Sequence, residues 1–333
     1  MLSIVHGGDL TEAMARHGGT PQQWLDLSTG INPWPWPIPS DLPPAVWQRL
    51  PSRVDQDHLI AVARTAYRVP GGVEIAIAPG TQALIQWMPR LAAPGPVAIM
   101  GPTYGEHALT WQSAGHEVVA WDDPGNLPEG VCHAVIVNPN NPDGRVVSPD
   151  AIVQLAARLG ERGGWLVLDE AFADVEPSVS AVAVCKGLPI VILRSFGKFY
   201  GLAGLRLGFA IGAPEIVQRI VAALGPWSCS GPALHIGALA LADRQWAEGT
   251  RDRLKRQANR LDDVLARTGF EVAGGTSLFR LARHRDALKR HATLARQHIW
   301  CRCFEGHEDL LRFGLPPDEA ALHRLSAALA EGE

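Results

Sequence analysis

Six short apolar runs, each flanked by helical patterns, constrain the fold of this chain more than any other feature. Strands that alternate with helices form mostly parallel sheets, because a parallel connection has to cross the sheet. The carboxyl ends of such strands meet at one edge, where open α/β sheets bind their ligands. The sequence therefore predicts an α/β fold with a ligand site at that edge. We expect the strands near residues 73–78, 96–100, 133–138, 165–169, 190–195 and 206–211.

The length and composition of the chain predict two domains. A chain of 333 residues, 47% of them hydrophobic, can bury a substantial core and exceeds the usual size of one domain. We expect a large domain at residues 41–222. Residues 1–40 and 223–333 are expected to form a smaller α+β domain.

Charge and cysteine content exclude several classes of protein. A net charge of −4 provides no electrostatic reason to expect nucleic-acid or membrane binding. No apolar run approaches the roughly 20 residues that cross a bilayer. The five cysteines show no paired framework, and no charged-then-apolar leader precedes His6, so we expect a cytoplasmic protein. Cys301 and Cys303 lack the second ligand pair of a structural zinc site, so no metal is expected.

Lys198 lies in a glycine-rich segment between the hydroxyl of Ser195 and the guanidinium of Arg206. This arrangement suits an aldehyde cofactor that bears a phosphate. The lysine amine can condense with the aldehyde, and the other two groups can bind the phosphate. An isolated Ser-x-x-Lys would more often be a surface turn, but motifs elsewhere in the chain favour the cofactor interpretation.

Asp169 ends the apolar run at residues 165–169, which places it at the carboxyl edge of a buried strand. A carboxylate there can pair with the protonated pyridine nitrogen of pyridoxal phosphate. It could instead cap the next helix. The adjacent Glu170 is interpreted as a loop acid.

Two further loops follow predicted strands. Gly80, Thr81 and Gln82 open an apparent helix, and backbone N–H groups at a helix start bind phosphate. Residues 138–144 form an Asn/Pro loop in which Asn141 could present an amide to a ring hydroxyl. Asn-Pro loops are also common turns.

In this order, the motifs resemble those of the fold-type-I pyridoxal-phosphate enzymes, the aspartate aminotransferase superfamily, over nearly the whole chain. The resemblance implies the fold-type-I transferase fold, pyridoxal 5′-phosphate as cofactor and a homodimer. It implies that Lys198 binds the cofactor covalently, that Asp169 pairs with the pyridinium nitrogen and that Asn141 bonds to the ring oxygen. It also implies a phosphate cup formed by Gly80, Thr81, Gln82, Ser195 and Arg206.

The resemblance extends to two more residues and has two departures. Tyr104 falls where the family stacks an aromatic ring on the cofactor, although it could be a core tyrosine. Arg312 matches the arginine that binds the substrate α-carboxylate. Phe172 stands where the family often has a tyrosine that touches the ring oxygen. Residues 49–51 read Arg-Leu-Pro, whereas many relatives have Arg-Tyr-Pro, whose tyrosine reaches the neighbouring subunit's cofactor.

The N-terminus distinguishes subgroups within this superfamily. Its opening, with His6, Gly7 and Gly8 ahead of Asn32, resembles the L-threonine-O-3-phosphate decarboxylases of cobalamin biosynthesis more than the histidinol-phosphate aminotransferases. Two glycines beside an imidazole can form a compact anion site, and Asn32 adds an amide donor. His-Gly-Gly could also be a mobile terminus. Arg302, ten positions before Arg312, is the candidate for binding a substrate phosphate.

The resemblance implies decarboxylation of L-threonine O-3-phosphate to (R)-1-amino-2-propanol O-2-phosphate and CO2, with Lys198, Asp169 and Tyr104 as catalytic residues. An aminotransferase acting on histidinol phosphate, or on a similar phosphorylated amino compound, remains open because it would use the same cup and lysine. A non-catalytic nucleotide-binding protein is a third alternative. It is disfavoured because no Gly-x-Gly-x-x-Gly follows a strand.

Overall fold

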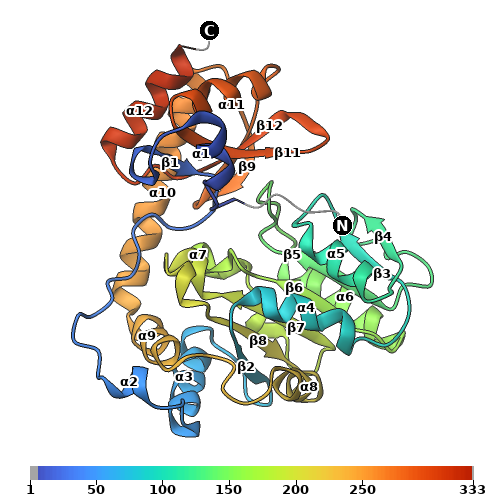
Figure 1. Ribbon diagram of the computed structural model, residues 1–333. Helices are drawn as coiled ribbons and strands as arrows, with labels where there is room; N and C mark the ends of the chain where they lie inside the picture. The colour runs from blue at the N-terminus through green and yellow to red at the C-terminus, as the bar shows by residue number, and fades with distance from the viewer. Residues whose placement is uncertain (1–6, 332–333) are drawn as a thin grey trace. The chain divides into compact units, whose positions relative to one another are not determined.

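The computed structural model describes residues 7–331, which divide into two compact units (Figure 1). The larger unit consists of Pro35–Asn141 and Arg145–Ala247. The smaller unit consists of the described residues up to Trp34, the short segment Pro142–Gly144, and the chain from Glu248 onward.

The larger unit is built on a seven-stranded sheet with the order β2-β8-β7-β6-β5-β3-β4. Strand β8 runs antiparallel to both of its neighbours, and the other pairs are parallel. The predicted α/β fold with a mostly parallel sheet is therefore confirmed, and the six expected strands lie within two residues of their predicted bounds. The prediction missed β4, a four-residue edge strand. The strands are β2 (Glu74–Ala78), β3 (Val97–Met100), β4 (Val118–Trp121), β5 (His133–Val137), β6 (Leu166–Asp169), β7 (Ile190–Ser195) and β8 (Gly208–Gly212).

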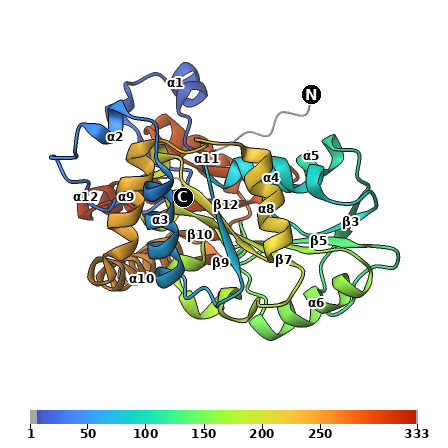
Figure 2. The same cartoon turned by 90° about the horizontal axis from the view of Figure 1, so that it is seen from below.

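Helices cover both faces of this sheet, which is why its central strands are buried along their whole length and are mostly apolar. Figure 2 shows α6 on the opposite face from α4 and α8. In α6, the buried Ile152, Leu155, Ala156 and Leu159 recur at the spacing of one helical face. The helices are α2 (Ala45–Gln48), α3 (Arg53–Ala66), α4 (Thr81–Leu91), α5 (Glu106–Ser113), α6 (Pro149–Glu161), α7 (Phe196–Phe199), α8 (Pro214–Leu224) and α9 (Gly231–Ala242).

Strand register brings the ends of several strands together at one edge of the sheet. Gly208 at the start of β8 pairs with Ala78 at the end of β2 and with Ser195 at the end of β7. Asp169, the last residue of β6, pairs with Val137 on one side and Leu193 on the other. The loops that follow β2, β5, β6 and β7 therefore begin at the same edge.

The smaller unit is an α+β structure with a five-stranded sheet of order β1-β11-β12-β10-β9. Strand β1 is parallel to β11, and the other pairs are antiparallel. None of the helices within residues 7–331 has both the length and the apolar character needed to cross a membrane. The strands are β1 (Leu25–Leu27), β9 (Glu271–Thr276), β10 (Phe279–Arg283), β11 (Ile299–Phe304) and β12 (His307–Gly314). The helices are α1 (Thr11–His17), α10 (Arg244–Arg267), which begins in the larger unit, α11 (Ala287–Arg296) and α12 (Glu319–Ala330).

Candidate active site

Asp169 is held at the end of β6 by two hydrogen-bond partners and is only 3% exposed. Its Oδ2 lies 3.0 Å from Nε2 of the buried His107, and its Oδ1 accepts a hydrogen bond from the backbone N–H of Ala171 at 3.0 Å. Carboxylate oxygens accept hydrogen bonds, so the tautomer of His107 with its proton on Nε2 would donate to Asp169. Sequence reasoning missed His107. Its position three residues after Tyr104, at the start of α5, was the available signal.

Lys198 lies in the short helix α7, directly after β7, and is half-buried. Its Nζ is 5.8 Å from the ring centroid of Phe172, which is buried and follows Asp169 by three residues. Because β6 and β7 are adjacent, parallel strands, the carboxylate and the amine both project from one edge of the sheet. An amine placed beside an aromatic ring and near a buried carboxylate suits covalent binding of an aromatic aldehyde.

Gly80 and Arg206 form the start of an anion site at the beginning of α4. Gly80 has φ +84°, and a Cβ built on it would lie 2.7 Å from Nη2 of Arg206. The guanidinium thus lies against the turn that exposes the first N–H groups of α4, including that of Thr81. The hydroxyl residue Ser195 ends β7 opposite Gly208 at this edge. A helix N-terminus, a guanidinium and a hydroxyl together suit a phosphate.

Tyr104 is fixed by contacts to both α4 and α5. Its hydroxyl lies 3.3 Å from Oε1 of Gln82, and Nε2 of Gln82 donates to Oε2 of Glu106 at 2.6 Å. The Tyr104 ring meets the His107 ring edge-on, with centroids 6.1 Å apart. Neighbouring residues Glu106 and His107 therefore link the Tyr104 segment to Gln82 and Asp169. The sequence did not reveal the role of Glu106, which is a buried acid.

The loop after β5 that carries Asn141 is held by its neighbours. Asn138 exchanges hydrogen bonds with the backbone of Val147, at 3.1 and 2.8 Å. Asn140 donates to the carbonyl of Pro102 at 2.9 Å and accepts from the hydroxyl of Thr103 at 2.6 Å. Asn141 itself is half-buried at the same sheet edge as Asp169.

Glu170 lies in the loop after β6, as the sequence indicated, but it is buried. This carboxylate is 0% exposed, and its Oε2 accepts a hydrogen bond from Nη1 of Arg194 at 2.8 Å. A sequence pattern does not reveal this pairing, because Glu170 lies in the loop after β6 and Arg194 lies on β7.

In the smaller unit, Gly7, Gly8 and Arg312 converge on Ser28. The backbone N–H of Gly8 donates to Oγ of Ser28 at 2.8 Å, and Nη2 of Arg312 donates to the Ser28 carbonyl at 2.7 Å. A Cβ on Gly7 would lie 2.4 Å from that carbonyl oxygen, so only glycine fits there. The predicted partner His6 lies outside the described residues. Ser28 was not among the predicted residues, although it lies in a segment that carries the N-terminal resemblance.

Arg302 and Arg312 are directly opposite each other on β11 and β12. Directly opposed residues of antiparallel strands share a face, where like charges destabilise each other. Burial, together with the positive charge of Arg302, lowers the pKa of Arg312 to about 10. An anion bound between the two guanidinium groups would relieve this repulsion. Asn32 is buried, and its Oδ1 accepts from the backbone N–H of Trp34 at 2.9 Å.

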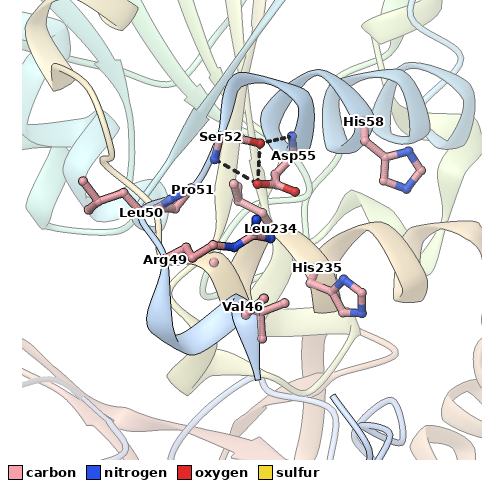
Figure 3. A pocket seen from close by; sticks show the side chains of 11 residues that line it. Val46, Arg49, Leu50, Pro51, Ser52, Asp55, His58, Leu234 and His235 are labelled. Carbon is pink, nitrogen blue, oxygen red and sulfur yellow. Dashed lines mark hydrogen bonds between the residues drawn. The ribbon is translucent and has the colours of Figure 1, made fainter. Parts of the chain in front are cut away.

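The Arg-Leu-Pro segment at residues 49–51 belongs to the larger unit, where it lines a cavity separate from the predicted site residues. Arg49, Leu50 and Pro51 line a cavity of about 100 Å³ together with His58 and His235 (Figure 3). None of the predicted site residues lines this cavity. Within residues 7–331, no group of three or more His, Cys, Asp or Glu side chains could hold a metal ion.

Comparisons with known proteins identify the family. Residues 59–329 match the model of the family "Aminotransferase class I and II". The chain is 44% identical to a threonine-phosphate decarboxylase from Pseudomonas aeruginosa, over 98% of this chain and 97% of the relative. It is 45% identical to a threonine-phosphate decarboxylase from a Sinorhizobium species, over 99% of this chain and 98% of the relative.

The fold also matches a solved structure. The crystal structure of histidinol-phosphate aminotransferase from Sinorhizobium meliloti in complex with pyridoxal-5′-phosphate superposes with a TM-score of 0.83. The match covers 99% of this chain and 95% of that chain at 21% identity, so it shows a shared fold and nothing about activity. With the family model matching most of its length, the chain belongs to the aminotransferase class I and II family.

Proposed function

We propose that this chain is a pyridoxal-phosphate-dependent lyase that decarboxylates L-threonine O-3-phosphate to (R)-1-amino-2-propanol O-2-phosphate and CO2, a step in building the side chain of cobalamin. The observation that carries the proposal is the identity of 44–45%, over nearly the full length of both chains, to two threonine-phosphate decarboxylases. The groups gathered at the sheet edge support the same reaction.

The residues of the larger unit fit pyridoxal phosphate by the chemistry of their donors and acceptors. Asp169, oriented by His107, offers a carboxylate to a protonated ring nitrogen. Lys198 offers the amine for the aldehyde, and Asn141 an amide for the ring oxygen. Tyr104 offers a ring to stack on the cofactor.

The phosphate of the cofactor would bind at the start of α4. There Gly80 leaves the space that the guanidinium of Arg206 approaches, and a side chain at position 80 would fill it. Backbone N–H groups of Thr81 and Gln82, with the hydroxyl of Ser195, complete the proposed cup. When bound, pyridoxal phosphate supplies an aldehyde that condenses with amines and a protonated ring that accepts an electron pair from Cα.

The substrate carries two anions, and two arginines are available for them. Arg312 would bind the α-carboxylate, and Arg302 would bind the substrate phosphate. The bound anions would also reduce the repulsion between the two guanidinium groups. The glycine pair Gly7 and Gly8, with Asn32 and His6, would supply further donors. By holding both anions, these residues fix which bond to Cα breaks.

Lys198 would then act on the proton that completes the reaction. Loss of CO2 leaves an electron pair at Cα, and a proton delivered to that atom by Nζ of Lys198 yields the amine product. Delivery of a proton to the cofactor instead would favour transamination, so the position of this amine controls the outcome.

A specific test separates the decarboxylase from an aminotransferase. The purified protein, loaded with pyridoxal phosphate, is incubated with L-threonine O-3-phosphate with and without 2-oxoglutarate, and separately with histidinol phosphate plus 2-oxoglutarate. We expect amine and CO2 in equal amounts, with no dependence on the oxo acid and no glutamate. Glutamate formed from histidinol phosphate, with no CO2 from threonine phosphate, would contradict the proposal.

We further propose that the protein is a homodimer. Ile38, Trp47, Leu50 and Trp227 are 47%, 65%, 68% and 55% exposed, and all line one apolar hollow of about 740 Å³. Exposed apolar clusters of this kind mark protein interfaces. Light scattering of the wild type should give twice the mass of the chain. Trp47→Glu should shift it toward the monomer, whereas a monomeric wild type would contradict this assignment.

The cytoplasm is the proposed compartment. All five cysteines, which are Cys132, Cys185, Cys229, Cys301 and Cys303, have free thiols. A protein that functions with unpaired cysteines suits a reducing compartment. Fractionation of cells that produce the protein at its natural level tests this placement.

A further inference from the structure

A buried ion pair lies directly beside the two strand ends that carry Asp169 and Ser195. Arg194 precedes Ser195 on β7, and Glu170 follows Asp169 at the end of β6. Nη1 of Arg194 donates to Oε2 of Glu170 at 2.8 Å, and the two residues are 3% and 0% exposed. Successive residues of a strand point to opposite faces, so Arg194 points away from the face on which Ser195 lies.

Arg194 also anchors the segment that follows Asp169. Its Nη2 donates to the carboxylate of Asp174, which is likewise buried. Further along the segment, the hydroxyl of Ser180 donates to Oε2 of Glu170 at 2.6 Å, and the N–H of Ala181 donates to its Oε1 at 2.7 Å. One guanidinium therefore ties residues 170–181 to β7. The same segment carries Phe172, whose ring centroid lies 5.8 Å from Nζ of Lys198.

Stability alone is a weak explanation for this network. Burial raises the pKa of Glu170, which reflects the cost of keeping its charge away from water. Buried ion pairs are often no more stable than apolar residues of similar volume, and their better-attested use is to specify geometry. The guanidinium of Arg194 also packs on the ring of Tyr67, with Cζ 4.6 Å from its centroid, so it has little freedom to move.

We propose that Arg194 is a positioning residue that fixes the distance between Asp169 and Ser195, by tying Glu170 and Asp174 to β7. This inference rests on the proposed function, in which those two residues bind opposite ends of pyridoxal phosphate. The cofactor has a rigid ring and a short phosphate arm. Both ends therefore bind together only when their two sites are correctly spaced.

The test measures linked binding rather than catalysis. Pyridoxine 5′-phosphate has an alcohol in place of the aldehyde, so it cannot bond covalently to Lys198. Its affinity for the full-length, cofactor-free protein is compared by calorimetry with the affinities of pyridoxine and of inorganic phosphate, which each occupy one end. The comparison is made for the wild type, Arg194→Lys and Glu170→Gln. Glu176→Gln is the control, because Glu176 is an exposed acid in the same segment.

A lysine at position 194 keeps the charge but cannot bridge two carboxylates through two nitrogens. We expect Arg194→Lys to lower the affinity for pyridoxine 5′-phosphate about tenfold or more. The affinities for pyridoxine and for inorganic phosphate should each change less than about threefold, because only a ligand that occupies both ends depends on the distance between them. Glu170→Gln should show the same pattern, which keeps the test decisive if Arg194→Lys does not fold. Glu176→Gln should change nothing.

Two results would overturn the inference. Unchanged affinity for pyridoxine 5′-phosphate in a variant with a lowered melting temperature would make the network purely structural. A parallel loss for all three ligands would mean that Arg194 shapes each end of the site separately and does not set the spacing between them. A wild type that binds no pyridoxine 5′-phosphate would instead count against the proposed function, so the two failures are distinguishable.

Discussion

Two glycines of β8 provide a paired test of where the cofactor phosphate binds. A Cβ on Gly208 would lie 2.8 Å from the backbone nitrogen of Thr81 and 3.0 Å from the carbonyl carbon of Gly80. Both atoms belong to backbone at the start of α4, so Gly208→Ala has to displace the proposed phosphate cup. A Cβ on Gly212, at the other end of the strand, would lie 2.3 Å from the carbonyl oxygen of Ile190.

Both substitutions should destabilise the protein to a similar extent. Forcing a methyl group into close-packed backbone costs about 1–3 kcal/mol, and the closer approach at position 212 places Gly212→Ala at or above Gly208→Ala. Only Gly208→Ala should lower the affinity of the protein for pyridoxal 5′-phosphate. A shift of the helix start by a few tenths of an ångström would cost about 1.4 kcal/mol of phosphate binding, or about tenfold in affinity.

The assay combines urea unfolding with a titration of pyridoxal phosphate into the cofactor-free protein. Gly204→Ala is the control, because a Cβ at that position meets no atom within 4 Å although it lies in the same glycine-rich segment. Equal losses of cofactor affinity in Gly208→Ala and Gly212→Ala would refute the reasoning. Full affinity in a destabilised Gly208→Ala would refute it as well.

Three further substitutions test the site and the core. His107→Phe removes the hydrogen-bond donor to Asp169 and should weaken pyridoxal-phosphate binding by about 1.5–3 kcal/mol, measured by equilibrium dialysis; unchanged binding would exclude His107 from the site. Arg312→Lys loses bidentate carboxylate recognition and should raise the KM for L-threonine O-3-phosphate by about tenfold or more; an unchanged KM would contradict the assignment. Burial lowers the pKa of His133 from 6.5 to about 4. Between these two pH values the unfolded chain binds a proton at His133 that the folded protein does not bind. Stability should therefore fall by up to about 2 kcal/mol as pH falls from 6.5 to 4, and His133→Phe should flatten this part of a urea-unfolding profile. A profile that is identical in the variant would show that another group titrates.

The sheet edge could be predicted from the sequence because each of its strands is a local signal. Asp169, Ser195 and Gly80 each end or follow an apolar run, and parallel strands place such ends together without any knowledge of side-chain contacts. The predicted residues of the larger unit accordingly lie at strand ends, at helix starts and in loops along one edge.

The residues that orient the site could not be predicted in this way. His107 reaches Asp169 across 62 positions of sequence, and Arg194 reaches Glu170 across 24 positions. Both pairings depend on how strands, helices and loops distant in sequence come together, and neither leaves a pattern in the residue types. The burial of Glu170 was missed for this reason, since an acid in the loop after a strand is usually solvated.

In the smaller unit, too, the sequence indicated candidate residues but not the contacts between them. Arg302 and Arg312 were each singled out from the sequence, but their direct pairing depends on the register of β11 and β12. The convergence of Gly8 and Arg312 on Ser28 joins residues 20 and 284 positions apart. Only the folded sheet brings those groups together.

The most direct test of the account follows the carboxyl carbon. L-threonine O-3-phosphate labelled with ¹³C at its carboxyl group is added to the pyridoxal-phosphate-loaded wild type and to Lys198→Ala without any oxo acid, and labelled CO2 and the amine are quantified together. We expect equal amounts of both from the wild type, and loss of turnover in Lys198→Ala. Retention of the label in the substrate with the wild type, or near-normal release of labelled CO2 by Lys198→Ala, would contradict it.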